Sequence, residues 1–150
     1  WNGKPNEGLK MIDAEIGRGI KQREQALRLK VRPGPADSSI FDEVNGDSPA
    51  KQQALTGIRW EKADKSPGSR IRGWSLLRAR LKSALKDRPD EPGLFIFSTC
   101  AQFIRTVPVL PRDPKKPDDV DTDAEDHIAD EVRYRLLQDK RITVVEPLRI

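Results

Sequence analysis

Apolar residues recur every three to four positions in three segments of the chain, the spacing of a helix with one buried face. Three long helices are predicted from this pattern, over residues 6–27, 71–86 and 124–138. Their apolar stripes are Leu9, Ile12, Ile16 and Ile20; Trp74, Leu77, Leu81 and Ala84 or Leu85; and Ile128, Val132 and Leu136. Most of the predicted core therefore comes from helices.

Two shorter helices are predicted, over residues 49–55 and 99–107. The first begins with a clear signal, because Ser48 can act as the N-cap and Pro49 can take the first helical position. Prolines at every third position or so between residues 108 and 117 then predict an extended loop that leads into the last helix.

Three strands are predicted between the helices, over residues 27–31, 57–63 and 93–98. The last reads GLFIFS, an unbroken apolar run that favours a central strand covered on both faces. Residues 142–145 add an edge strand or a docking tail. Because strands alternate with helices, we expect one α/β domain over residues 1–150, with a largely parallel sheet flanked by helices.

Composition limits the size of the core, and basic and acidic residues concentrate in different segments of the chain. Apolar and charged residues each make up 35% of the 150 residues, so we expect one modest core and much solvated surface. The net charge of +4 hides a basic segment at residues 59–88 and an acidic one at residues 113–131. This arrangement suits an enzyme that grips a polyanion beside a metal site. The charge pattern taken alone favours the alternative, a solvated surface of alternating charge.

Cys100 is the only cysteine, so no intrachain disulfide is possible, and this usage fits a reducing cytoplasm. We expect its side chain to be a small buried group. No segment has the roughly 18 apolar residues that a membrane span needs. The chain begins at Trp1 rather than at a methionine, and we expect it to be part of a longer polypeptide.

The candidate chemistry lies in the acidic segment DDVDTDAEDHIADEVRY, residues 118–134. His127, the only histidine, and Asp130 are three residues apart and share one helix face, the way ligands are presented to a divalent metal. Asp126 lies one turn earlier and either joins the site or caps the helix. For Asp121 and Asp123 we favour helix capping.

Asp37 follows a predicted strand, where a carboxylate reaches the mouth of an α/β sheet, although it could equally cap its own turn. Trp60 and Trp74 are assigned to the core. Four basic residues near the Ser-Pro-Gly turn are candidates for gripping DNA phosphates: Lys62, Lys65, Arg70 and Arg72. An EF-hand register across the acidic segment is disfavoured, because Ala124 replaces its essential glycine.

Four segments in order, ADSSIF, ADKSPGSRIRGW, GLFIFSTCAQFIRTVPVL and DVDTDAEDHIADEVRYRLL, resemble the nuclease domain of phage terminase large subunits. The resemblance implies a ribonuclease H-like fold that cuts concatemeric double-stranded DNA with two Mg²⁺ or Mn²⁺ ions. It makes Asp37 the middle metal-binding aspartate, Asp130 the third and His127 an accessory histidine. The implied partners are DNA, the small terminase subunit, the portal protein and the ATPase domain of the same polypeptide, in the host bacterial cytoplasm.

The family's first aspartate lies on an opening strand that has no counterpart here, and no GxxxxGK[ST] phosphate loop is present. We therefore expect a partial, N-terminally truncated nuclease domain. The alternative is a non-catalytic module that docks DNA or the portal.

Overall fold

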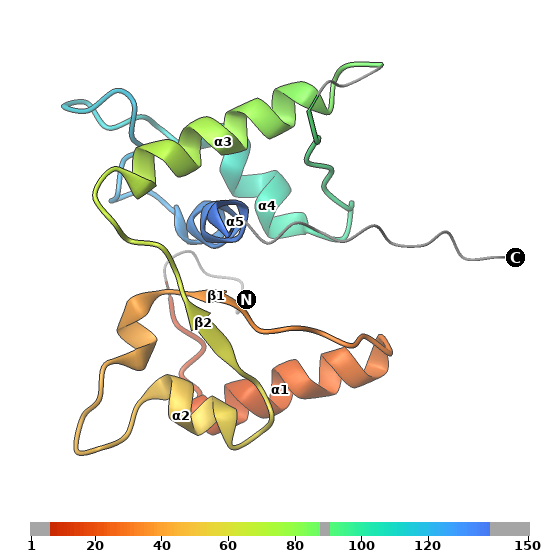
Figure 1. Cartoon of the computed structure of the whole chain (residues 1–150), viewed down its shortest axis with the longest axis vertical. Coiled ribbons are helices and arrows are strands. Elements are labelled where there is room, and N and C mark those ends of the chain that lie inside the picture. The colour runs from red at the N-terminus through yellow and green to blue at the C-terminus, as the bar shows by residue number, and fades with distance from the viewer. Residues whose placement is uncertain (1–6, 88–90, 139–150) are drawn as a thin grey trace, which may run out of the picture.

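The computed structural model describes residues 7–87 and 91–138 and shows a mixed α/β arrangement (Figure 1). In chain order its elements are α1 (Asp13–Ala26), β1 (Gly34–Ala36), the 3₁₀ turn η1 (Ser38–Phe41), α2 (Pro49–Ala54), β2 (Trp60–Lys62), α3 (Ser69–Ser83), α4 (Ala101–Thr106), the 3₁₀ turn η2 (Val107–Val109) and α5 (His127–Leu137). The expected α/β class is thus confirmed, with helices as its dominant elements.

The two strands form a small parallel sheet that lies between α5 and the α1–α2 pair (Figure 1). Gly34 pairs with Trp60 and Ala36 with Lys62, and the amide of Ala63 extends the ladder to the carbonyl of Ala36 at 2.9 Å. Residue 37 follows β1 directly, so the sheet holds its side chain at the carboxyl end of a strand, against α5.

The main core lies in the half built from α3, α4 and α5. Trp74 and Leu77 of α3 pack with Phe103 of α4, with Ala129 of α5 and with Val120 of the loop before α5. Trp74, which is 2% exposed, and Leu77 belong to the stripe that helical spacing predicted for α3. The predicted stripe of α5, which is Ile128, Val132 and Leu136, is partly buried and packs against this cluster. The helix N-cap at Ser48 is also confirmed, since its hydroxyl accepts a hydrogen bond from the amide of Lys51 at 3.3 Å.

The predicted strand over residues 27–31 is wrong, because the segment ends helix α1 instead. Arg28 takes a left-handed conformation with φ of 53°, and the amide of Leu29 bonds back to the carbonyl of Glu24 at 2.9 Å. Such a reversal closes a helix C-terminus. The strand begins only at Gly34, three residues after the predicted segment.

The predicted central strand over residues 93–98 is also wrong. Leu94 and Ile96 pack against the core, but Phe95 and Phe97 are 74% and 81% exposed, so only one face is covered. The amide of Leu94 bonds to the carbonyl of Arg80 in α3 rather than to a strand. An apolar run alone does not supply a pairing partner.

Smaller corrections concern element ends and single residues. The first long helix begins at Asp13 and the last at His127, both later than predicted. Leu85 is 87% exposed, which leaves the half-buried Ala84 as the last position of the α3 stripe, and Cys100 is exposed rather than buried. The predictions for Asn6 and for residues 142–145 lie outside the described residues.

Helices α3 and α5 meet closely at Gly73, which predicts the effect of adding a methyl group there. A Cβ at Gly73 would lie 2.2 Å from Cγ of the buried Arg133, so Gly73→Ala must displace that side chain. We expect a loss of about 1–3 kcal/mol in the free energy of unfolding, measured by urea titration. The matched change Gly19→Ala, in helix α1, meets only the end of Arg23 at 3.4 Å and should stabilise by up to about 1 kcal/mol.

Candidate functional site

Asp37 has two roles at the end of β1. Its Oδ1 accepts a hydrogen bond from the amide of Ser39 at 2.9 Å, so Asp37 caps η1. This is the capping role that the sequence predicted as the alternative for Asp37. Its Oδ2 faces the other way, 2.6 Å from Nζ of Lys65 and 2.8 Å from the hydroxyl of Tyr134. The cap therefore fixes a carboxylate that points toward α5.

Asp130 comes from α5, one turn before Tyr134. Its Oδ2 lies 3.5 Å from the Tyr134 hydroxyl, which places that hydroxyl between the two carboxylates. A hydroxyl has one proton, so its short bond goes to Asp37 and its contact with Asp130 is the weaker one. Arg133, one turn from Asp130 on the same helix, donates from Nη2 at 3.0 Å.

These contacts shift two pKa values in opposite directions. Burial acts to raise the pKa of Asp37, but the Lys65 ammonium and the donors of Ser39 and Tyr134 outweigh it and hold that pKa well below its usual range. Burial and the neighbouring carboxylates raise the pKa of Tyr134 above its ordinary value. Asp37 is thus anionic and Tyr134 a neutral donor at neutral pH.

Arg70, in the first turn of α3, contacts three aspartates. Its guanidinium lies 2.7 Å from Asp119, 3.1 Å from Asp126 and 3.4 Å from Asp130. The side chains of these acids are 10–20% exposed. Burial lowers the pKa of Arg70, but the carboxylates outweigh this effect and raise it. We call these four residues the Arg70 cluster.

The indole of Trp74 supports the Arg70 cluster from the core. Its Nε1 donates to Asp119 at 2.8 Å, and its ring lies 5.4 Å from the guanidinium of Arg70 and 5.1 Å from that of Arg133. Two cations therefore contact one buried ring. Burial acts to raise the pKa of Asp119. The hydrogen bonds from Arg70 and Trp74 outweigh burial, so this pKa is lowered.

The four residues predicted to grip DNA are spread over different environments. Arg70 lies inside its cluster, Lys65 pairs with Asp37, and Arg72 pairs with Asp64 at 2.6 Å. Lys62 lies over the ring of Phe41, 5.5 Å from its centroid. Three of the four thus have an aspartate as their immediate partner.

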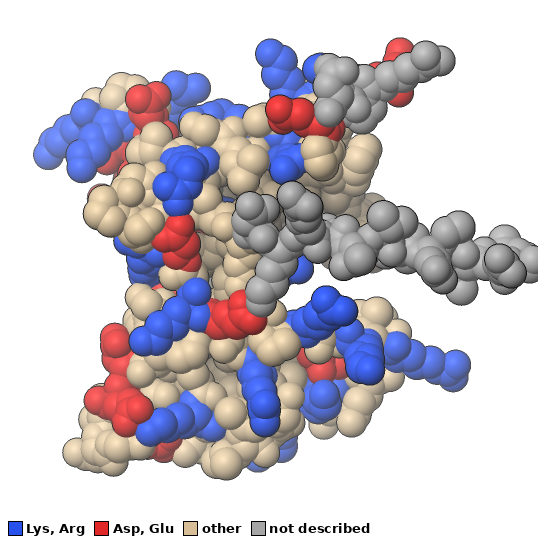
Figure 2. Space-filling view, viewed as in Figure 1, with Lys and Arg blue, Asp and Glu red and all other residues tan. Residues whose placement is uncertain are grey.

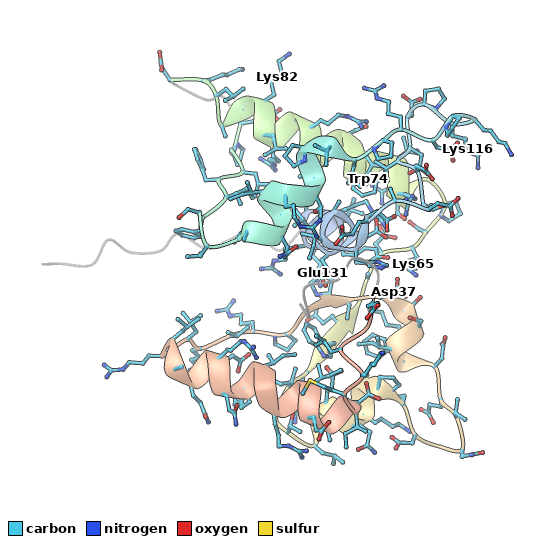
Figure 3. The ribbon with its side chains drawn as sticks, turned by 180° about the vertical axis from the view of Figure 1, so that it is seen from behind. Asp37, Lys65, Trp74, Lys82, Lys116 and Glu131 are labelled. Atoms are coloured by element: carbon cyan, nitrogen blue, oxygen red, sulfur yellow. The ribbon has the colours of Figure 1, made fainter. Side chains whose placement is uncertain are left out.

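A pocket of about 620 Å³ brings the predicted site residues together where α5 faces β1, which we call the carboxylate pocket (Figure 3). Asp37, His127 and Asp130 all line it. His127 is the first residue of α5, with its side chain 74% exposed and Nδ1 3.8 Å from Oδ1 of Asp126. Asp126 itself points toward Arg70.

Two further residues of this pocket were missed by sequence reasoning. Tyr134 and Glu131 line it beside Asp130. Desolvation raises the pKa of Glu131, and the nearby His127 partly opposes that effect. Helical spacing could have found both, because residues three or four positions from His127 and Asp130 share their face.

Asp37 and Asp130 fit a divalent-ion site by donor type, because Mg²⁺ and Mn²⁺ prefer carboxylate oxygens. Each is already balanced by cations: Asp37 by Lys65, and Asp130 by Arg70 and Arg133. Within residues 7–87 and 91–138, no group of three or more His, Cys, Asp or Glu side chains is arranged to hold a metal ion. The described residues therefore offer two ligands rather than a complete set.

No protein-family model matches the chain, and no curated protein or solved structure resembles it significantly. None of the described helices is long and apolar enough to cross a bilayer.

The Arg70 cluster predicts a large effect for removing its cation. Arg70→Met would leave Asp119 and Asp126 without their cation, while Asp130 keeps its ion pair with Arg133, and we expect a loss of about 3 kcal/mol in the free energy of unfolding. Arg70→Lys keeps the charge but loses the planar donors, so it should fall between wild type and Arg70→Met. Urea unfolding of the three proteins measures this order, and equal stabilities would contradict it.

The lowered pKa of Asp37 predicts how stability changes with pH. Since the folded value lies below the unfolded value of about 3.9, the carboxylate stabilises the fold above that pH and loses its effect as the pH falls below it. Lys65→Gln should therefore reduce the difference in unfolding free energy between neutral and strongly acidic pH. Because both side chains are more than a third exposed, we expect less than about 1 kcal/mol.

Proposed function

We propose that this chain is a metal-dependent endonuclease domain with a ribonuclease H-like fold, from the large subunit of a viral DNA-packaging terminase. One observation supports it above the others. Asp37 and Asp130, the two aspartates implied by the resemblance, lie on different elements and approach the same Tyr134 hydroxyl in a pocket that His127 also lines. Carboxylates that converge from a strand end and a helix suit two-metal hydrolysis.

In this proposal Asp37 and Asp130 hold Mg²⁺ or Mn²⁺, which would activate water for attack on a phosphodiester. Tyr134 fixes the orientation of Asp37 by its hydrogen bond. His127, exposed at the pocket rim, donates a hydrogen bond to the scissile phosphate. Lys65 lies close enough to Asp37 to offset negative charge when DNA enters.

The resemblance extends the proposal to partners and to one missing ligand. The substrate would be concatemeric double-stranded DNA, and the portal protein, the small terminase subunit and an ATPase domain of the same polypeptide would act with it in the host bacterial cytoplasm. A further aspartate, on a strand upstream of this chain, would complete the metal site.

A docking module without catalysis is the second candidate, and the ion pairs support it. Lys65 and Arg70 already neutralise the two carboxylates, and the described residues supply no third ligand. Such a module would bind DNA or the portal, and its binding would not depend on Asp37 or Asp130.

Plasmid cleavage in Mn²⁺ tests the two candidates. For a nuclease, Asp130→Asn and Asp37→Asn should abolish cutting, because each removes a charged metal ligand, and His127→Ala should slow it by roughly 100-fold. Gel electrophoresis of nicked and linear plasmid gives the rates. Asp123→Asn, on an exposed turn outside the pocket, is the matched control and should cut at the wild-type rate.

The assay is run on this chain and on an extended form. The extended form adds, before Trp1, the opening strand that carries the first aspartate in the terminase family. Cutting by the extended form alone, lost in its Asp130→Asn variant, would support the nuclease and assign the missing ligand to the added strand. If neither form cuts in Mg²⁺ or Mn²⁺, the nuclease proposal fails and the docking module is favoured.

A further inference from the structure

A second cleft, of about 610 Å³, adjoins the carboxylate pocket. Ile20 and Trp60 line both hollows, so the two lie next to each other. The second cleft lies between α1, the segment leading into β1, and the start of β2. We call it the basic cleft, because its charged residues are Lys21, Lys30, Arg32, Arg59 and Arg135, with Glu24 as its one acid.

Within residues 7–87 and 91–138, most of this positive charge has no carboxylate partner. Glu24 is bound to Lys21, with 3.0 Å between Nζ and Oε2. Lys30, Arg32 and Arg59 are exposed and form no ion pair in the part of the chain that the structure describes. They differ in this from Lys65, Arg70 and Arg72, whose charges are matched by aspartates. The field of the cleft is therefore available to an anion.

The shape of the cleft admits an extended ligand. Gly34 and Gly57 contribute backbone without side chains to its wall, and a Cβ at Gly34 would meet nothing within 4 Å. Figure 2 shows Lys and Arg side chains gathered over α1 and over the chain between α1 and β1. An open wall with cations around it fits a chain of phosphates better than a compact ion.

We infer that the basic cleft binds the sugar–phosphate backbone of a nucleic acid strand whose neighbouring segment lies at the carboxylate pocket. The inference rests on the proposed nuclease function. Gly34 lines the cleft and Asp37 lines the pocket, three residues farther along an extended chain, which is about 10 Å. That length corresponds to about three nucleotides of one strand of a duplex.

The binding test compares two sets of charge substitutions. The cleft variant is Lys30→Gln, Arg32→Gln, Arg59→Gln. The matched control is Arg78→Gln, Lys82→Gln, Lys116→Gln, which removes the same charge from exposed positions outside the cleft, in the α3 half of the molecule (Figure 3). Binding of a short fluorescein-labelled duplex is measured by anisotropy over a range of NaCl concentrations, in EDTA so that no metal-dependent step contributes.

The cleft variant should bind at least about tenfold more weakly, and the slope of log K against log salt should fall by about 2 to 3 in magnitude. The control variant should bind as wild type does. Equal losses in the two variants, or no loss in either, would overturn the inference. So would a cleft variant that binds DNA normally but no longer binds polyglutamate, since the occupant would then be an acidic protein segment.

Failure of this inference is distinguishable from failure of the nuclease proposal. If wild type and control bind DNA, the cleft variant does not, and no form cuts, then the cleft stands without the nuclease. If Asp130→Asn abolishes cutting while the cleft variant binds DNA as wild type does, the nuclease stands and DNA takes another route to the pocket.

Discussion

The rest of the structure depends most on the ion pairs between the guanidinium of Arg70 and three aspartates. The guanidinium joins the first turn of α3 to the loop at Asp119, to the residue before α5 at Asp126 and to Asp130 inside α5. Without Arg70, Asp119 and Asp126 would lose their cation, and Asp130 would keep only its ion pair with Arg133. Because Arg70 fixes the start of α5, it also sets where Tyr134 and the carboxylate pocket lie.

The helices could be predicted from the sequence because their signals are local. Periodic apolar residues found the buried faces of α3 and α5, and the Ser48 cap marked the start of α2. A strand needs a partner strand elsewhere in the chain. Neither alternating apolar residues nor an apolar run shows which segment that partner is. Residues 27–31 therefore became a helix end, and Phe95 and Phe97 remained exposed beside a one-sided core contact.

The sequence pointed to three residues of the pocket but missed Glu131 and Tyr134, and it did not show how the charged side chains pair. Asp37, His127 and Asp130 do line one pocket, whereas the partners of the basic residues depend on contacts such as Arg70 with Asp130, 60 positions apart. The sequence shows where the basic residues are but not which of them pair with a carboxylate in the folded chain. The four basic residues predicted to grip DNA were mostly paired. Lys30, Arg32 and Arg59, which form no ion pair among the described residues, were not among those four.

The hydrogen bond from Tyr134 to Asp37 joins residues 97 positions apart. Closing so long a loop is entropically unfavourable, so contacts of this kind form after local helices. During translation at about 5–20 residues per second, roughly 5–20 s separate the addition of Asp37 from that of Tyr134. The nascent chain therefore carries no assembled carboxylate pocket until Tyr134 has been added and has left the ribosome, and whatever chemistry the pocket performs cannot begin earlier.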